Sequence, residues 1–362
     1  MTRLAGAPES AAAAEHGGTC SKARDKKRSV SQPAHPGAGK AAGDSEKGYR
    51  ILRQATLRDR VTLEGVGVHS GKPVRLVLHP ADAGSGIWFL RTGLADGGRE
   101  HLIAARHYAV GATKLCTVLR DESGASVATV EHLMAALAGL GIDNLTIEID
   151  GPEMPILDGS SAPFVAAIDQ VGIVEQASYR RFIKVLKPVR VEEGAGFAEL
   201  RPADKGFKLD VEIDFDTPLI GRQRRITTLT PQVFRREIAR ARTFGFMRDV
   251  EMAWKNNFAL GASLDNTVVI GEDRIVNPEG LRWADEFVRH KTLDAIGDLA
   301  LSGAPLQGLY RSYRPGHTLN AKVLAKLMED RTAYALVDER PVRESGHAGV
   351  VMTAPAFAPE TN

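Results

Sequence analysis

A seven-residue segment that occurs twice is the feature that most restricts how this chain can fold. Leu78-His-Pro-Ala-Asp-Ala-Gly84 recurs as Leu200-Arg-Pro-Ala-Asp-Lys-Gly206, and both copies follow one strand-like segment and precede the next. Each copy is followed later in the chain by a long helix pattern, beginning near Val130 and near Glu286. A duplication that produced two sheet-plus-helix units would explain this arrangement.

Composition along the chain indicates where these units begin and end. Residues 1–47 are rich in Ala, Gly, Ser and Lys, and we expect a disordered tail because they offer little apolar surface to bury. The first unit then covers 48–175 and the second 182–350, because apolar patterning lapses near Glu175–Arg181. Residues 351–362 are expected to form a flexible C-terminus.

Charge and cysteine content exclude several classes of protein. Lys and Arg total 47 against 45 Asp and Glu, and this balance argues against a dedicated nucleic-acid binder. The two cysteines, Cys20 and Cys116, cannot build a disulfide framework, which favours a reducing cytoplasm. We find neither an apolar run near the ~20 residues of a membrane span nor the apolar core of a signal peptide.

The first unit shows clear local signals for strands and a helix. Alternating residues predict two strands between Val61 and Leu78 around a Gly-rich turn, and a further strand over Leu145–Ile149. Between them, apolar residues at i, i+3, i+4 and i+7 from Val130 predict a helix. We expect Thr129 to cap its start and Gly139 and Gly141 to end it.

The second long helix pattern carries the strongest cluster of chemical groups. His290, Asp294, Asp298 and Lys291 fall within about 100° of one another on a helical projection, opposite an apolar face. A histidine and an aspartate at i and i+4 can reach a single metal ion. The alternative is a solvated face with a surface His–Asp pair, and this helix alone favours that alternative.

The first helix pattern changes this balance, because Glu131 and His132 lie in its first turn and His132 points away from the apolar stripe. An adjacent carboxylate and imidazole can serve a hydrolytic metal as base and ligand. Together the two helices offer the three protein ligands of a catalytic zinc. A Pro-Gly turn places His317 at the start of another helix, where it could also be merely solvated, and His69 lies in a Gly-rich turn that could approach a ligand.

Several segments together resemble the LpxC family, the zinc-dependent UDP-3-O-acyl-N-acetylglucosamine deacetylases of bacterial lipid A synthesis. The resemblance extends over about residues 49–345, and it rests on these segments: Gly65–Gly71, Thr129–Asn144, Pro155–Phe164, Ala241–Asp249, Asp285–Asp298 and Gly316–Asn320. It implies an α+β fold of two similar sheet-plus-helix sandwich domains, with the active site between them.

The resemblance also implies roles for individual residues. His132, His290 and Asp294 would hold the zinc, although ferrous iron also fits these ligands. Glu131 would be the general base, His317 the second acid/base group, and Asp298 the residue that orients it. Thr243 and Lys291 would stabilise the oxyanion and bind substrate. The expected substrate-binding residues are Phe244, Phe246, Met247, Val250, Leu264, Gly316 and His69. For the apolar residues of the stretch 244–264, ordinary core packing is the alternative to an acyl-chain passage.

The implied activity is hydrolysis of UDP-3-O-acyl-N-acetylglucosamine to UDP-3-O-acyl-glucosamine and acetate, the committed step of lipid A synthesis, by zinc-activated water. Lys291 and the Arg-rich loop Arg311–Arg314 could bind the UDP end of the substrate. Because the substrate is amphipathic, we expect a cytoplasmic enzyme peripheral to the inner membrane. The basic tail 1–47 would weakly strengthen its binding to the anionic membrane surface. Alternatives are a zinc amidohydrolase for another acylated amino sugar, and a non-catalytic sugar-nucleotide or nucleic-acid binding protein.

Overall fold

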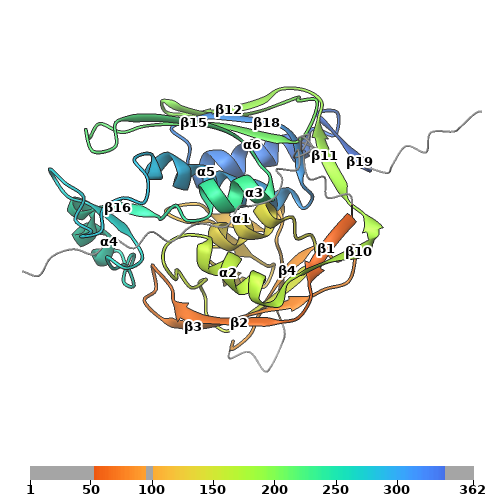
Figure 1. Ribbon diagram of the computed structural model, residues 1–362, viewed down its shortest axis with the longest axis horizontal. Helices are drawn as coiled ribbons and strands as arrows, with labels where there is room; N and C mark the ends of the chain where they lie inside the picture. The colour runs from red at the N-terminus through yellow and green to blue at the C-terminus, as the bar shows by residue number, and fades with distance from the viewer. Residues whose placement is uncertain (1–52, 95–100, 339–362) are drawn as a thin grey trace, which may run out of the picture. The chain divides into compact units, whose positions relative to one another are not determined.

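Two sheets with the same strand connectivity dominate the fold. The computed structural model describes residues 53–94 and 101–338, so the predicted tail 1–47 and C-terminus 351–362 lie outside the described residues. In Figure 1, β2 and β3 lie on one side of the central helices, and β12, β15 and β18 lie on the other. The mixture of helices and several sheets confirms the predicted α+β class.

The two sheets repeat one order of five strands. The first runs β2 (Val61–Val66), β3 (Pro73–Pro80), β9 (Leu145–Ile149), β4 (Ile87–Arg91) and β5 (His101–Ala104). The equivalent strands of the second are β12 (Val189–Glu193), β13 (Gly196–Arg201), β18 (Leu306–Tyr313), β14 (Phe207–Asp214) and β15 (Arg222–Thr228).

The direction of each strand is repeated as well. In each sheet the middle strand pairs antiparallel with one neighbour, β3 or β13, and parallel with the other, β4 or β14. The duplicated seven-residue segment therefore makes the same strand-to-strand connection in both halves.

Smaller elements complete the sheets. β1 (Arg53–Leu57) pairs with β10 (Ile173–Tyr179), while β11 (Arg181–Val185) and β19 (Tyr334–Asp338) extend the second sheet. β6 (Val110–Ala112), β7 (Val118–Arg120) and β8 (Ser126–Val127) form a small sheet, and β16 (Phe244–Phe246) pairs parallel with β17 (Val268–Ile270). The lapse in apolar patterning at 175–181 corresponds to the end of the partly exposed strand β10. Only Arg180 separates β10 from β11, and the division into 48–175 and 182–350 stays a prediction.

Four helices lie between the sheets (Figure 1): α1 (Glu131–Leu140), α2 (Ala162–Val171), α5 (Glu286–Leu299) and α6 (His317–Glu329). The shorter helical segments are η1 (His107–Ala109), α3 (Pro231–Val233) with η2 (Phe234–Ile238), η3 (Met247–Asp249), α4 (Val250–Lys255) and η4 (Ala300–Ser302). Among the described residues, no helix has the length and apolar character to cross a bilayer.

Close packing of α1 against α5 sets the geometry of the site. A Cβ on Gly297 of α5 would lie 2.0 Å from the carbonyl oxygen of Glu131, so only glycine allows this approach. Gly139 lies inside α1 rather than ending it as predicted, and a Cβ there would lie 2.3 Å from the ring of Phe234. Gly141, with φ of 80°, ends α1 as predicted.

The start of α1 differs from the prediction. Thr129 is not the N-cap: Val130 holds that position, and no side chain caps the helix. Thr129 has φ of 59°, and its hydroxyl donates to the buried carboxylate of Glu153 at 3.0 Å. The same carboxylate accepts hydrogen bonds from the backbone N–H groups of His69 and Ser70. A buried acceptor from a distant segment thus takes the hydroxyl that local capping would have used.

Candidate active site

The predicted metal ligands meet where α1 packs on α5. His132 comes from α1, and His290 and Asp294 come from α5; all three are buried, and their ligand atoms lie within 4.8 Å of one another. Oδ1 of Asp294 is 3.7 Å from Nε2 of His132 and 3.3 Å from Nε2 of His290. Two ligands of one tetrahedral zinc are separated by about 3.4 Å, so this spacing suits a bound ion.

The electronic state of these groups also suits a cation. Nδ1 of His290 donates to the carbonyl oxygen of Ala241 at 3.0 Å, which leaves the Nε2 lone pair of the neutral ring facing Asp294. Burial lowers the pKa of His290, and burial followed by the neighbouring His290 lowers that of His132 to about 3. Oδ1 of Asp294 is buried and accepts no hydrogen bond among the described residues. Facing acceptors with no proton between them are unfavourable unless a cation lies there.

Asp294 remains ionised in this interior. Burial would raise its pKa, but His290 and Lys291 outweigh that effect and hold the pKa well below its usual range. Nζ of Lys291 donates to Oδ2 of Asp294 at 2.9 Å, away from the oxygen that faces the imidazoles. The residues therefore fit a divalent cation. The alternative of a solvated stripe on α5 is wrong for His290, Asp294 and Asp298, which are all buried.

An acid–base pair lies beside the ligands. Nε2 of His317, the first residue of α6, is 3.7 Å from Oε1 of Glu131. Burial raises the pKa of Glu131 to about 7, against the opposing charge of His317. Burial would lower the pKa of His317, but Asp298 and then Glu131 outweigh it and raise the pKa to about 9. Both side chains are buried, so the reading of His317 as a solvated loop residue is wrong.

A carboxylate supports His317 from behind. Oδ2 of Asp298 accepts from Nδ1 of His317 at 2.9 Å and from Nδ2 of Asn320 at 2.8 Å. Oδ1 accepts from the hydroxyl of Thr117 at 2.6 Å. The sequence indicated no role for Thr117 or Asn320, although Asn320 belongs to the segment Gly316–Asn320 and could have been noticed there.

The aromatic residues predicted at the site divide into two groups. Phe244 contacts the rings of Phe287 and His290, with centroids 4.9 and 6.1 Å away, and Lys291 lies over its face at 5.7 Å. Phe246 meets Phe215, whose centroid is 6.0 Å away. Phe244 therefore borders the candidate metal group, and Phe246 extends this aromatic surface.

The remaining apolar residues of the insert do not form a core. Met247 and Leu264 are exposed, as are Met252, Trp254 and Leu260, so the core alternative is wrong for them. Val250, the first residue of α4, is partly buried. The substrate-binding role of Met247, Val250 and Leu264 stays a prediction.

Three other predicted residues lie on segments around the site. The ring of His69 contacts Phe258 at 5.4 Å, and the backbone N–H groups of Leu260 and Gly261 donate to the carbonyls of His69 and Val68. Gly316 immediately precedes α6 in extended conformation. The backbone N–H of Thr243 donates to the carbonyl oxygen of Gly159. Thr243 lies two residues after Ala241, whose carbonyl accepts from His290. The oxyanion role of Thr243 stays a prediction.

Cys116 and the Arg-rich loop predicted at 311–314 complete the surroundings of the site. Cys116 is buried, and burial together with Glu131 raises the pKa of its thiol to about 12. The Arg-rich segment is not a loop: Arg311 lies in β18, where it pairs with Asp210 at 3.6 Å. Arg314 follows the strand and pairs with Asp214 at 3.1 Å, so both arginines already have carboxylate partners.

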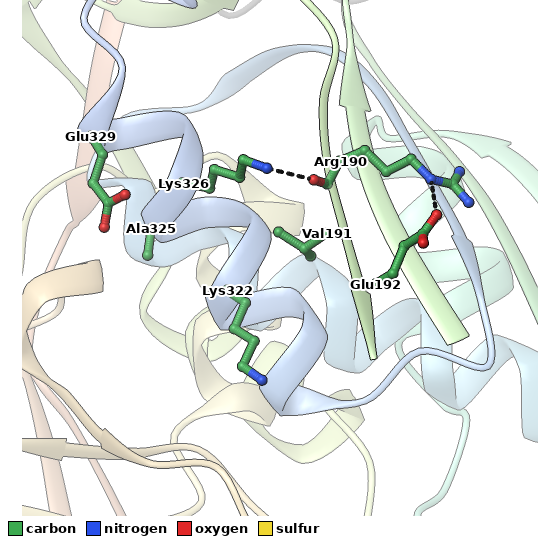
Figure 2. A pocket seen from close by; sticks show the side chains of 7 residues that line it. All are labelled: Arg190, Val191, Glu192, Lys322, Ala325, Lys326 and Glu329. Carbon is green, nitrogen blue, oxygen red and sulfur yellow. Dashed lines mark hydrogen bonds and ion pairs between the residues drawn. The ribbon is translucent and has the colours of Figure 1, made fainter. Parts of the chain in front are cut away.

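A groove of about 760 Å³ lies elsewhere, between β12 and α6. Figure 2 shows Lys326 reaching the carbonyl of Arg190 and the Arg190 side chain reaching Glu192. Its lining residues are Arg190, Val191, Glu192, Lys322, Ala325, Lys326 and Glu329. They include none of the predicted site residues.

Comparison with known proteins shows the family to which this chain belongs. Residues 54–329 match the sequence model of the LpxC family, described as UDP-3-O-acyl N-acetylglycosamine deacetylase. The chain is 54% identical over 286 residues to proteins of Brucella ovis and Brucella canis named UDP-3-O-acyl-N-acetylglucosamine deacetylase. A protein of the same name from Brucella melitensis biotype 2 is 53% identical. Each match covers 79% of this chain and 98% of the relative. The chain therefore belongs to the LpxC family.

Proposed function

We propose that this chain hydrolyses the acetamide of UDP-3-O-acyl-N-acetylglucosamine, releasing acetate and UDP-3-O-acyl-glucosamine in lipid A synthesis. The relatives carry the name of this activity. The observation that supports it most is the orphaned oxygen of Asp294 facing two neutral imidazoles, beside the pair Glu131 and His317. A metal-assisted amide hydrolysis needs both parts in one place.

We propose Zn²⁺ as the ion, held by His132, His290 and Asp294, since imidazole and carboxylate ligands suit it; Fe²⁺ is the second candidate. When bound, the ion supplies a Lewis acid that polarises the amide carbonyl and makes water more acidic. The ionised Glu131 takes a proton from the attacking water, and a pKa of about 7 suits a base that works near neutrality.

His317 has the complementary task. Its raised pKa keeps the ring cationic at neutral pH, and Nε2 lies on the side of Glu131. We assign it to stabilise negative charge on the tetrahedral centre and then to protonate the departing amine, which is a poor leaving group without a proton. Lys291 and Thr243 are proposed to stabilise the oxyanion and to bind substrate, because preorganised donors lower the barrier when charge develops next to them.

We propose that the acyl end of the substrate follows the aromatic surface of the insert. Phe244 borders the metal group and Phe246 continues toward Phe215. Met247, Val250 and Leu264 would extend this apolar path. His69 and Gly316 are proposed to contact the polar part of the substrate, because His69 packs against the insert and Gly316 precedes the catalytic His317.

We further propose that the enzyme works on the cytoplasmic surface of the inner membrane, because an acylated nucleotide sugar is amphipathic. Met252 and Trp254 support this placement, since they are 68% and 56% exposed on one short helix. Exposed large apolar groups of this kind mark contact surfaces for membranes or partners. The basic tail, to which we also gave a membrane role, lies outside the described residues.

The activity is tested by acetate release from UDP-3-O-acyl-N-acetylglucosamine with zinc-loaded protein. UDP-N-acetylglucosamine without the acyl chain and the acylated sugar without UDP serve as comparison substrates. We expect at least about 100-fold higher kcat/KM for the complete substrate. Equal turnover of the acylated sugar without UDP would instead identify an amidohydrolase for another amino sugar, and absence of turnover with tightly bound zinc would contradict the proposal.

A further inference from the structure

The carboxylate of Asp298 is the centre of a buried network that reaches beyond its contact with His317. Its two oxygens accept three hydrogen bonds, from His317, Asn320 and Thr117. Asn320 and Thr117 are each 1% exposed, so water does not take their place. Because His317 and Asn320 are at i and i+3 in the first turn of α6, both reach the same oxygen of Asp298.

The orientation of the Asn320 amide follows from the groups on its two sides, Asp298 and Tyr310. An ionised carboxylate only accepts, so the amide of Asn320 must present its NH₂ group to Asp298. Its other face, the amide oxygen, accepts from the hydroxyl of Tyr310 on β18. Tyr310 is fully buried, and burial raises its pKa, so the phenol remains a donor. The Tyr310 hydroxyl therefore stabilises the orientation of Asn320 in which the NH₂ group faces the carboxylate.

This arrangement bears on the protonation of His317. In a buried site, the ion pair of carboxylate and imidazolium competes with the neutral pair in which the proton has moved to the carboxylate. Hydrogen bonds donated to the charged form of a carboxylate favour that form. Asn320 and Thr117 are neutral, so they stabilise the anion of Asp298 without cancelling its charge.

Other groups that face His317 have to be considered alongside Asp298. The titratable side chains around it are Asp294, His290 and Asp298 on α5, Glu131 and His132 on α1, and His69 on the β2–β3 turn. Asp298 accepts a hydrogen bond from Nδ1 of the ring, while Nε2 faces Glu131. The state of Asp298 thus affects His317 more directly than the others do.

We propose that Asn320, whose amide is held by Tyr310, is a positioning residue that works with Thr117 to hold the carboxylate of Asp298 against Nδ1 of His317, the ring assigned to proton donation. This inference rests on the proposed function for its catalytic meaning, but not for its effect on the His317 ring. It assigns a task to three side chains that act through Asp298; the backbone N–H of Thr117 separately donates to Oε2 of Glu131 at 3.1 Å.

The test measures the His317 ring directly, in full-length zinc-loaded protein labelled with ¹⁵N-histidine. The His317 signals are assigned with a His317→Gln variant, and their midpoint is followed by NMR against pH. In Tyr310→Phe and Asn320→Leu we expect the midpoint to fall by about one pH unit, a tenfold loss of proton affinity. Tyr313→Phe is the matched control: it removes the same atom from the same strand, where the hydroxyl donates to Asp214, and should leave the midpoint unchanged.

Kinetics provide the second readout. Deacetylation by Tyr310→Phe should show kcat at pH 7 reduced at least about fivefold, with KM within twofold, and an alkaline limb that begins at lower pH. Thr117→Val should behave in the same way. Thr117→Ser should keep the wild-type profile, because it retains the hydroxyl that donates to Asp298. This pair also keeps the inference testable should Asn320→Leu fail to fold.

The two proposals fail in different ways. An unchanged His317 midpoint in folded Tyr310→Phe and Thr117→Val protein would overturn the positioning role, whatever the enzyme acts on. A lowered midpoint in protein that does not deacetylate the substrate would support the network and contradict the proposed function.

Discussion

The change Gly297→Ala tests whether the contact between α1 and α5 builds the metal group. The new Cβ would lie 2.0 Å from the carbonyl oxygen of Glu131, whereas ordinary contact begins at 3.4 Å. The obstacle is backbone, which no rotamer change can move, so the two helices must separate by about 1.4 Å at this point. His132 would move with α1, while His290 and Asp294 stay with α5.

The expected loss follows from this distance. Metal sites keep ligand distances within about 0.2 Å, so the displaced site should bind zinc at least about 100-fold more weakly. A misplacement of about 1 Å costs on the order of 100-fold in rate, and overpacking costs about 1–3 kcal/mol of stability. Dialysis against zinc buffers, kcat/KM and urea unfolding measure the three effects. Gly111→Ala is the control, because its Cβ would make only ordinary contact, 3.5 Å from Arg120. Wild-type zinc affinity and turnover in Gly297→Ala would refute the reasoning.

Three further outcomes are expected. Glu131→Gln should lower kcat about 100-fold or more while zinc content stays at one equivalent, and undiminished turnover would rule out the base. The kcat/KM profile should rise with pH as Glu131 ionises and fall as His317 loses its proton; without metal, their pKa values are about 7 and about 9. Bound zinc should move both limbs to lower pH. A flat profile between pH 5 and 10 would contradict both roles. The double variant Met252→Glu, Trp254→Glu should bind anionic vesicles at least fivefold more weakly than Ile226→Glu, an equally exposed change on β15, and equal binding would remove the insert from the membrane contact.

The sequence was most informative where chemistry and local pattern coincide. His290 and Asp294 are four residues apart on one helix, so their proximity needs no tertiary information. The duplicated segment indicated a repeated unit because it makes the same strand connection in both halves. His317 was placed correctly at a helix start by the Pro-Gly turn that precedes it.

The sequence was least informative where distant segments compete for one group. Thr129 has a side chain suited to a helix cap, but its hydroxyl donates to Glu153, which is 24 residues away in the sequence. Gly139 has the residue type of a helix end, but it lies inside the helix, where the ring of Phe234 leaves no room for a Cβ. The support of Asp298 by Thr117 joins residues 181 positions apart, and no local pattern indicates such a contact.

The central claim is that His132, His290 and Asp294 hold one divalent ion that the chain uses to deacetylate UDP-3-O-acyl-N-acetylglucosamine. The most direct measurement strips the purified protein of metal, returns Zn²⁺ in steps, and follows acetate release together with bound zinc. We predict no release without metal and full activity at one equivalent, with both lost in His290→Ala. Activity that survives metal removal, or one equivalent of zinc still bound tightly by His290→Ala, would contradict the account.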